Sequence, residues 1–332
     1  MLYVHGAGHF HPENVIDNRF LEELDIDTSD AWIVDRVGIR ERRTVMSLDY
    51  IKTTRNADPA AALEASDYTN AQTGARAATA ALECAGLGVD DVGLILAGSC
   101  TPQTSCPAES CTIGGELGVE VPGIDVNSAC SSLAAQIYLL DQMRPEALPD
   151  YVLVINPDNS TRGINYADRD TCVLWGDGTA ALVVSTKVPA PLQISHSTFT
   201  SQPSGHEKVQ FLQHRHFRQD GRTVQTFAIK RTVAMIKQMR KNLTEEENAR
   251  LKFIGHQANL AMLASVCKWT GIDSDNHLYN VDRFGNCGAA GGPSVLSQNF
   301  DSLVAGDVIA LAVVGSGLSW GGMLLHKTRE AA

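Results

Sequence analysis

Short apolar runs alternate with longer stretches of helical periodicity along most of the chain. The runs are rich in Val, Ile, Leu and Ala and have the length of buried strands, whereas apolar residues between them recur every three to four positions. This alternation predicts a layered α/β fold. Strands are predicted at 92–99, 123–126, 151–156, 180–185, 252–257, 278–281, 308–317 and 322–327, after a first strand at the N-terminus, and helices include 74–87 and 226–243.

The strand signals of the two ends of the chain resemble each other in order and spacing. "DVGLILAGS" resembles "LKFIGHQAN", and "GIDVNSACSSLAA" resembles "LYNVDRFGNCGAAGG". "PDYVLVINPDNS" resembles "AGDVIALAVVGSG", and "GDGTAALVVS" resembles "LSWGGMLLHK". We infer two duplicated halves, 1–186 and 187–332, packed face to face. Residues just beyond corresponding strands would then meet between the halves, where ligands of open α/β sheets gather.

Two polar segments interrupt this pattern. Residues 44–73 carry no strand signal, and we interpret them as an insertion in the first half that forms a lid or lines a tunnel. Residues 195–224 are predicted to form a solvated loop. This loop contains His196, His206, His214 and His216, but no third ligand at fixed spacing accompanies its H-x-H pair, so no metal site is predicted.

Composition narrows the class of protein. The 332 residues carry a formal net charge of −11, which argues against a general role in binding nucleic acid or a membrane surface. No apolar run approaches the roughly 18 to 20 residues of a membrane span. The N-terminus lacks the features of a signal peptide. The eight cysteines form no CxxC pair, so reduced thiols in a cytoplasmic protein are expected.

Cys130 stands where a buried strand turns into a helix, in "GIDVNSACSSLAA". The start of a helix presents unpaired N–H groups and a partial positive charge, which favour a thiolate and can hold an oxyanion. The alternative is a small buried thiol that only fills space.

Possible partners of this thiol follow strands of the second half. His256 ends a buried strand in "FIGHQAN", and Asn286 lies in the glycine-rich turn "FGNCGAAGG". A lone histidine at such a position is more often a core residue, and Asn286 taken alone would be a turn asparagine. A further turn, "VVGSGLSWGG", can supply a backbone N–H. A thiol, an imidazole, an amide and such a donor together suit acyl transfer through a thioester.

Six motifs in this order resemble the β-ketoacyl-ACP synthase III family of the thiolase-like superfamily. They are "DTSDAWIVDRVGIRERR", "SACSS", "LWGDGTAALVV", "GHQAN", "NVDRFGNCGAA" and "GSGLSWGG", and they span nearly the whole chain. The resemblance implies a five-layered α-β-α-β-α fold built from two duplicated halves, and usually a homodimer.

The resemblance also implies roles for individual residues. Cys130 would take an acyl group from an acyl thioester, with its own N–H and that of Ser316 forming the oxyanion hole. His256 and Asn286 would bind the carbonyl of a malonyl thioester and stabilise the enolate formed on decarboxylation. Condensation with the acyl-enzyme would give a β-ketoacyl thioester.

Binding partners follow from the same resemblance. Trp32, Arg36 and Arg169 match positions that hold the nucleotide end of coenzyme A, which would act as a substrate and not as a resident cofactor. An acyl carrier protein is expected to deliver the malonyl group, but this chain has fewer of the basic residues that bind the carrier protein in the family. Arg231, Lys237 and Lys268 would substitute in part.

Several departures from the family pattern favour a specialised member over a housekeeping one. Ser132 and Ser316 replace glycines of two motifs, Ala261 and Thr226 replace basic residues, and the segment 44–73 is long. Two other functions stay open. One is an acyltransferase that passes the Cys130-bound acyl group to an alcohol or amine. The other is a non-catalytic partner subunit of a heteromeric synthase, which would be expected to lose the cysteine or the histidine.

Overall fold

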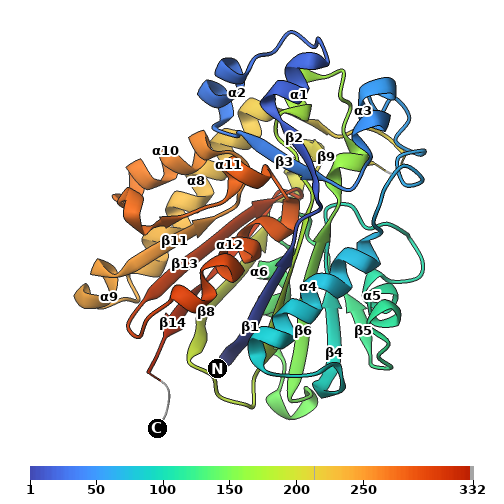
Figure 1. Ribbon diagram of the computed structural model, residues 1–332. Helices are drawn as coiled ribbons and strands as arrows, with labels where there is room; N and C mark the ends of the chain where they lie inside the picture. Colours follow the sequence, from blue (N-terminus) through green and yellow to red (C-terminus); the bar gives the residue numbers. More distant parts are fainter. Residues whose placement is uncertain (213, 330–332) are drawn as a thin grey trace.

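The first half of the chain supplies five strands in the order β5-β4-β6-β7-β1 (Figure 1). The computed structural model describes residues 1–212 and 214–329. Strand β4 runs parallel to β5 and β6, whereas β7 runs antiparallel to both β6 and β1. The bounds are β1 (Leu2–Phe10), β4 (Val92–Ala97), β5 (Gly123–Asp125), β6 (Tyr151–Asp158) and β7 (Gly178–Ser185).

The second half repeats this arrangement as β12-β11-β13-β14-β8. Strand β11 is parallel to β12 and β13, and β14 is antiparallel to β13 and β8. The duplication inferred from the sequence is therefore confirmed. The bounds are β8 (Leu192–Ser201), β11 (Leu251–Gly255), β12 (His277–Leu278), β13 (Val308–Gly315) and β14 (Ser319–Lys327).

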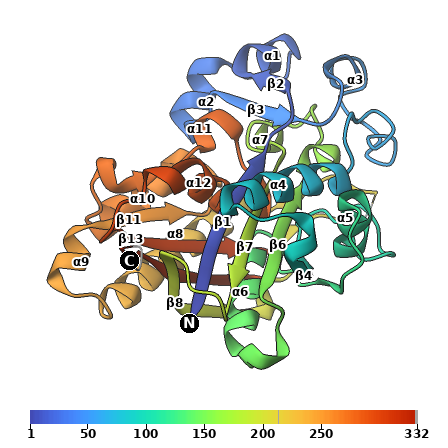
Figure 2. The same cartoon turned by 60° about the horizontal axis from the view of Figure 1, so that its bottom comes forward.

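Helices complete the five layers expected from the sequence. Helices α6 and α12 lie in the middle, and each contacts strands of both halves. Helices α4 and α5 cover the outer face of the first half, and α8 and α10 cover that of the second (Figures 1 and 2). Their bounds are α4 (Asn70–Ala85), α5 (Glu109–Leu117), α6 (Ser132–Gln142), α8 (Gly221–Arg240), α10 (Leu260–Thr270) and α12 (Gly291–Asn299).

The two halves join through their first strands. Strand β1 pairs with β8 from Leu2 to Val4, so that all ten strands form one continuous sheet. Further along β1, a Cβ on Gly8 would come within 2.3 Å of Ala77 O and of Ala81 N in α4. Glycine is required there because the backbones of helix and strand are almost in contact.

A cap of smaller elements covers the carboxyl ends of the strands (Figure 1). It is built mainly from residues before α4. Its bounds are β2 (Asn14–Asp17), α1 (Asn18–Glu23), α2 (Asp30–Val37), β3 (Glu41–Thr44) and α3 (Leu48–Thr54). The remaining elements are α7 (Arg169–Cys172), β9 (Val209–Gln210), β10 (Arg218–Gln219), α9 (Glu245–Ala249) and α11 (Val281–Phe284).

The strands predicted from apolar runs are all present, although several end one or two residues earlier than predicted. The run at 278–281 gives only the two-residue strand β12, because Val281 already begins α11. The backbone N–H groups of Asn280 and Val281 turn instead to the side-chain oxygen of Gln257. The division at 186/187 falls in the connection between β7 and β8. Among the described residues, no helix combines the length and the apolar character needed to cross a bilayer.

Candidate active site

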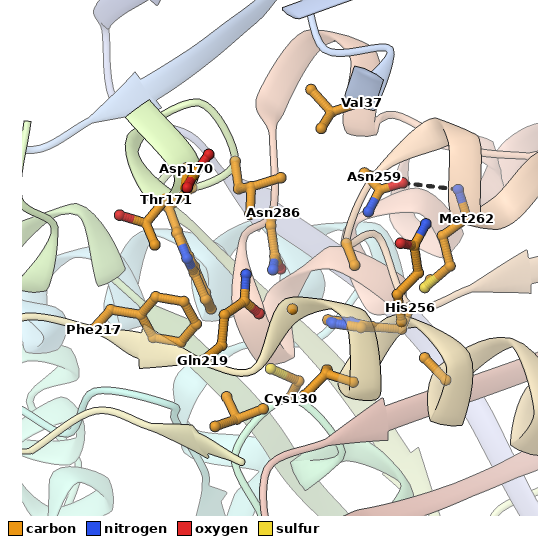
Figure 3. A pocket seen from close by; sticks show the side chains of 18 of the residues that line it. Val37, Cys130, Asp170, Thr171, Phe217, Gln219, His256, Asn259, Met262 and Asn286 are labelled. Atoms are coloured by element: carbon orange, nitrogen blue, oxygen red, sulfur yellow. Dashed lines mark hydrogen bonds between the residues drawn. The ribbon is translucent and has the colours of Figure 1, made fainter. Parts of the chain in front are cut away.

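A cavity of about 620 Å³ opens at the carboxyl ends of strands from both halves. Cys130, His256 and Asn286 project into its inner end (Figure 3). Each of the three is only 7% exposed, whereas Arg36 and Arg222 at its outer end are exposed. Three side chains separated by up to 156 positions in the sequence are thus brought to one partly desolvated point.

The turn that carries Cys130 is held by serine hydroxyls. Ala129, just before the cysteine, has a φ of +49°, an uncommon value for a residue with a side chain. Ser132 Oγ accepts a 2.9 Å hydrogen bond from Ser128 N–H and donates a 2.6 Å bond to Ala129 O. The serine that replaces the expected glycine therefore braces the turn, and α6 begins at this residue.

The glycine-rich turn after β13 lies against the start of α6. A Cβ on Gly315 would stand 2.8 Å from Ser131 N, which leaves room for no larger residue. Ser131 Oγ and Ser319 Oγ are 2.8 Å apart, and Ser319 Oγ donates to Ser316 O at 2.7 Å. The Ser316 hydroxyl donates to Val209 O at 2.6 Å. Ser316 lines the same cavity as the cysteine, so its backbone is held beside the thiol.

Backbone pairing positions the histidine and the asparagine. The His256 N–H donates to Ala312 O at 3.0 Å and continues the pairing of β11 with β13 by one residue. The Asn286 N–H donates to Leu174 O at 2.8 Å. Asn286 Oδ1 accepts from Gly288 N–H at 3.1 Å, so the amide NH2 is the end left for a ligand in the cavity.

A second thiol, to which no role was assigned from the sequence, lies beside Cys130. Cys100 Sγ is 3.3 Å from Cys130 Sγ. Cys100 follows β4 and Cys130 follows the adjacent parallel strand β5, which explains the contact. The buried Asp158 carboxylate fixes this position, because its Oδ1 accepts from Cys100 N–H at 2.7 Å and from Ser99 Oγ at 2.9 Å. Two cysteines just beyond neighbouring strands were the signal in the sequence.

The two thiols have different electrostatic surroundings. A hydrogen bond from the Cys100 thiol and the facing His256 imidazole hold the pKa of Cys130 well below its usual value. Burial, the bond to Cys130 and the Asp158 carboxylate raise the pKa of Cys100. Burial also raises the pKa of Asp158 to about 8. Negative charge is therefore favoured on Cys130 over Cys100.

The predicted coenzyme A residues gather around one indole ring. Trp32 and Arg36 line the outer part of the cavity. The guanidinium carbon of Arg36 is 5.3 Å from the Trp32 ring centre, and that of Arg169 is 5.1 Å from it. Arg169 is not among the residues that line the cavity, and its Nη1 forms a 2.6 Å ion pair with Asp27.

The prediction of a solvated loop over 195–224 is correct only in part, because most described residues of 202–220 are exposed but the two ends and a short hairpin belong to regular elements. Its first residues belong to β8, which pairs with β14 inside the sheet. Its later residues form the β9–β10 hairpin and the start of α8, which cover the cavity and line it with Val209, Phe217, Gln219 and Arg222 (Figure 3). The polar sequence hid this role because a segment that covers a cavity exposes its outer face to solvent and therefore carries many polar residues. Within the described part of the chain, no group of three metal-binding side chains occurs.

The segment 44–73 is not the lid. Among its residues, Met46, Ile51, Asn56 and Ala62 are fully buried, and none of the segment lines the cavity. The Asn56 amide donates to Arg162 O and Ile164 O at 2.8 and 2.9 Å, so this segment is packed against the chain that follows β6.

Two family profiles match the chain. The profile of 3-oxoacyl-[acyl-carrier-protein] synthase III covers residues 124–203, and that of the C-terminal part of the same enzyme covers residues 235–327. The first contains the turn of Cys130, and the second contains His256 and Asn286.

Similar proteins extend this likeness to the whole chain. The β-ketoacyl-[acyl-carrier-protein] synthase III of Oceanobacillus iheyensis is 31% identical over 328 residues, which are 97% of each chain. The solved 3-oxoacyl-[acyl-carrier-protein] synthase III of Aquifex aeolicus is 27% identical, with a TM-score of 0.86 over 98% of this chain and 100% of its own. A priming β-ketosynthase of a polyketide pathway, 22% identical, shares the fold at a TM-score of 0.83 over 100% of this chain and 97% of its own.

Proposed function

This chain belongs to the β-ketoacyl-ACP synthase III family, and we propose that it condenses a Cys130-bound acyl group with a malonyl thioester. Its family makes it a condensing enzyme of fatty-acid or secondary-metabolite biosynthesis. The observation that carries the proposed mechanism is the convergence of Cys130, His256 and Asn286 at the inner end of one cavity.

In the first half-reaction, the Cys130 thiolate attacks the carbonyl carbon of an acyl thioester. The oxyanion that forms is held by the N–H groups of Cys130 and Ser316, one at the start of α6 and the other in the turn that lies against it. The carbon–sulfur bond to the donor then breaks, and the donor leaves as a thiolate that takes up the proton Cys130 lost when it ionised. The lowered pKa of Cys130 supports this assignment, since the thiolate is the reactive form.

In the second half-reaction, a malonyl thioester occupies the emptied donor site. Its thioester carbonyl accepts hydrogen bonds from the His256 imidazole and the Asn286 amide, which remain in place because backbone bonds fix both residues. Loss of CO₂ leaves an enolate whose charge develops on that oxygen. The enolate carbon attacks the acyl carbonyl, Cys130 is released, and the product is a β-ketoacyl thioester.

The cavity has separate places for the two ends of an acyl-CoA donor. Trp32 and Arg36 at the mouth suit an adenine ring and phosphates, because indole stacks on a base and arginine pairs with phosphate. The apolar acyl chain would lie against the inner wall, where Phe217 and Trp175 contact each other with ring centres 4.8 Å apart. Coenzyme A enters and leaves as a substrate, so the proposed reaction needs no resident cofactor.

Helix α8 is the proposed docking surface for the acyl carrier protein. It carries five basic residues and no acidic one, although the whole chain is acidic. Arg222 at its first turn is exposed and lines the cavity, which would place an acidic partner beside the entrance. Lys237 and Lys268 are exposed, whereas Arg231 is engaged over the Trp320 ring at 4.3 Å.

A homodimer is proposed from the free edge of the sheet. Strand β5 ends the sheet, and Ile124 within it is 49% exposed. Exposed Tyr138 and Leu139 of α6, and Met143 directly after it, add apolar surface. Unpaired edges with apolar side chains invite pairing with a second copy. A cytoplasmic location remains a proposal that rests on the cysteine content and the family.

The function is tested by following the acyl group on the protein. The enzyme is mixed with acyl-CoAs from acetyl to dodecanoyl, and its intact mass is measured, with Cys130→Ala as the negative control and Cys287→Ala as a matched buried-cysteine control. Malonyl-CoA or malonyl carrier protein is then added and the released product identified.

Mass gain that is absent in Cys130→Ala and is discharged as a β-ketoacyl product supports the proposal. Discharge only by alcohols or amines would replace it with a plain acyltransferase. If neither the wild type nor the Cys287→Ala control takes up an acyl group from any donor, the result would favour a non-catalytic partner subunit. The preferred chain length also decides whether the enzyme is a specialised member, as Ser132 and Ser316 suggest.

A further inference from the structure

We propose that Cys100 and Cys130 form a reversible disulfide that blocks the active site under oxidation and protects the nucleophile. The proposal rests on the proposed function only in taking Cys130 as the acyl carrier. Within the described residues, no other two cysteine sulfurs are in contact. The other six cysteines are scattered, three of them exposed and three buried.

The geometry already brings the two sulfurs close together. They are 3.3 Å apart, and an S–S bond of about 2.05 Å requires them to approach by only about 1 Å. Both thiols stand on turns beyond adjacent parallel strands, so the backbone need not cross the cavity. Gly288 closes the far side of Cys100, because a Cβ there would stand 2.8 Å from its Sγ.

The two thiols also differ in access to the cavity and in ionisation, as expected for a pair in which one thiol reacts with the oxidant and the other closes the disulfide. Cys130 lines the cavity, where a small oxidant can arrive, and its surroundings favour the thiolate, which is the form that oxidants attack. Cys100 keeps its proton and lies behind Cys130, next to the Asp158 carboxylate. Cys130 is therefore the thiol attacked first, and Cys100 is the resolving thiol.

The reaction balances with hydrogen peroxide as the oxidant. The Cys130 thiolate attacks one peroxide oxygen, the O–O bond breaks, and a sulfenic acid and hydroxide form. Cys100 then attacks the Cys130 sulfur, the S–O bond breaks, and water leaves with the Cys100 proton. The net change is two thiols oxidised by two electrons and one peroxide reduced to two waters. A dithiol reverses it by exchange.

Two consequences follow for the enzyme. The disulfide removes the only nucleophile proposed for acyl loading, so oxidised enzyme cannot carry an acyl group. It also keeps Cys130 from passing to sulfinic acid, which dithiols do not reduce. An acyl group on Cys130 would prevent both events, since the sulfur is then a thioester.

The test measures cross-linking and recovery separately. Purified enzyme is treated with hydrogen peroxide, its remaining thiols are alkylated, and peptides are mapped without reduction. Trypsin leaves the chain between Arg76 and Arg144 intact, so a protease that cuts after glutamate, at Glu109 and Glu120, is needed to separate the two cysteines. Acyl loading is measured before oxidation, after it, and after dithiothreitol.

In the wild type we expect a Cys100–Cys130 peptide, loss of loading, and recovery with dithiothreitol. Cys100→Ala and Cys100→Ser should show no such peptide and lose loading permanently, each compared with its own untreated rate. Cys106→Ala, which removes an exposed thiol of the loop after Cys100, should behave as the wild type does.

Wild type without the cross-linked peptide, or Cys100→Ala that recovers as fully as the wild type, would overturn the proposal. Peptide mapping needs no activity, so it gives an answer even if a variant is unstable. Untreated enzyme that never loads an acyl group would refute the proposed function while leaving the cross-link measurable.

Discussion

Replacing Cys100 by alanine removes the thiol that lies 3.3 Å from the Cys130 sulfur and to which we assign a hydrogen bond to the thiolate. A hydrogen bond to a charged group stabilises it by about 1.5–3 kcal/mol. The thiol is a weak donor, so the lower end applies. At about 1.4 kcal/mol per pKa unit, the pKa of Cys130 should rise by about one unit. The midpoint of the alkylation rate against pH should therefore move up by about one unit, and at pH values below the wild-type midpoint the thiolate fraction, and with it the alkylation rate, should fall about tenfold.

The assay is the rate of Cys130 alkylation by iodoacetamide across a pH series, followed by peptide mass. Cys100→Ser keeps a hydroxyl donor and should retain most of the wild-type midpoint. Cys100→Val fills the space without a donor and should resemble Cys100→Ala. Cys111→Ala, an exposed thiol remote from the cavity, serves as the matched control. A midpoint that does not move, or moves down, in Cys100→Ala would refute the assignment of Cys100 as the donor.

Three further changes separate the parts of the site. Asn286→Ala should lower the condensation rate by about 10² to 10³-fold and leave acyl loading intact, because the amide acts on the enolate. Single-turnover measurements of acyl loading and of product formation distinguish the two steps. Equal loss of both rates would contradict this role. Trp32→Ala and Arg36→Ala should each raise the KM for acyl-CoA about tenfold and change the KM for acyl-pantetheine little, because acyl-pantetheine lacks the nucleotide. Equal effects on the KM of both donors would mean that these residues do not bind the nucleotide. Asp158 should make the fold less stable as pH rises from about 4 to about 8, because its folded pKa of about 8 lies above its unfolded value of 3.8 and the unfolded chain loses the proton first. Urea unfolding at pH 5 and pH 8 should show a smaller difference for Asp158→Asn than for the wild type, and equal differences would contradict the assignment.

Much of the architecture could be predicted from the chain because its signals are local or repeated. Buried strands need continuous apolar runs, and the same series of four runs occurs twice, so the strands and the duplication were accessible without coordinates. The order of the strands within the sheet was not predicted. The positions of Cys130, His256 and Asn286 just after such runs pointed to the carboxyl edge of the sheet. Motif resemblance then supplied the family, which the comparisons confirmed.

The same reasoning failed where the fate of a polar segment depended on its neighbours. Residues 44–73 and 195–224 are both polar segments, yet the first packs against the chain after β6 and lines none of the cavity, whereas residues of the second line it. Hydropathy gives the average polarity of a segment, and it does not tell which part of the fold the segment packs against. Asn56 is fully buried, and its side-chain amide donates hydrogen bonds to two backbone carbonyl groups. A polar side chain can therefore belong to the interior when its hydrogen bonds are satisfied there.

The sequence by itself determined the fold class, the duplication and the three residues that converge, because periodicity and motif spacing are properties of the chain. Only the tertiary structure decided that Cys100 touches Cys130, that Ser132 braces the turn of Cys130, and that the β9–β10 hairpin covers the cavity. Contacts between side chains depend on sheet register, on the path of each turn and on the direction of each Cβ. Those quantities are fixed when the two halves pack together, and no local pattern encodes them.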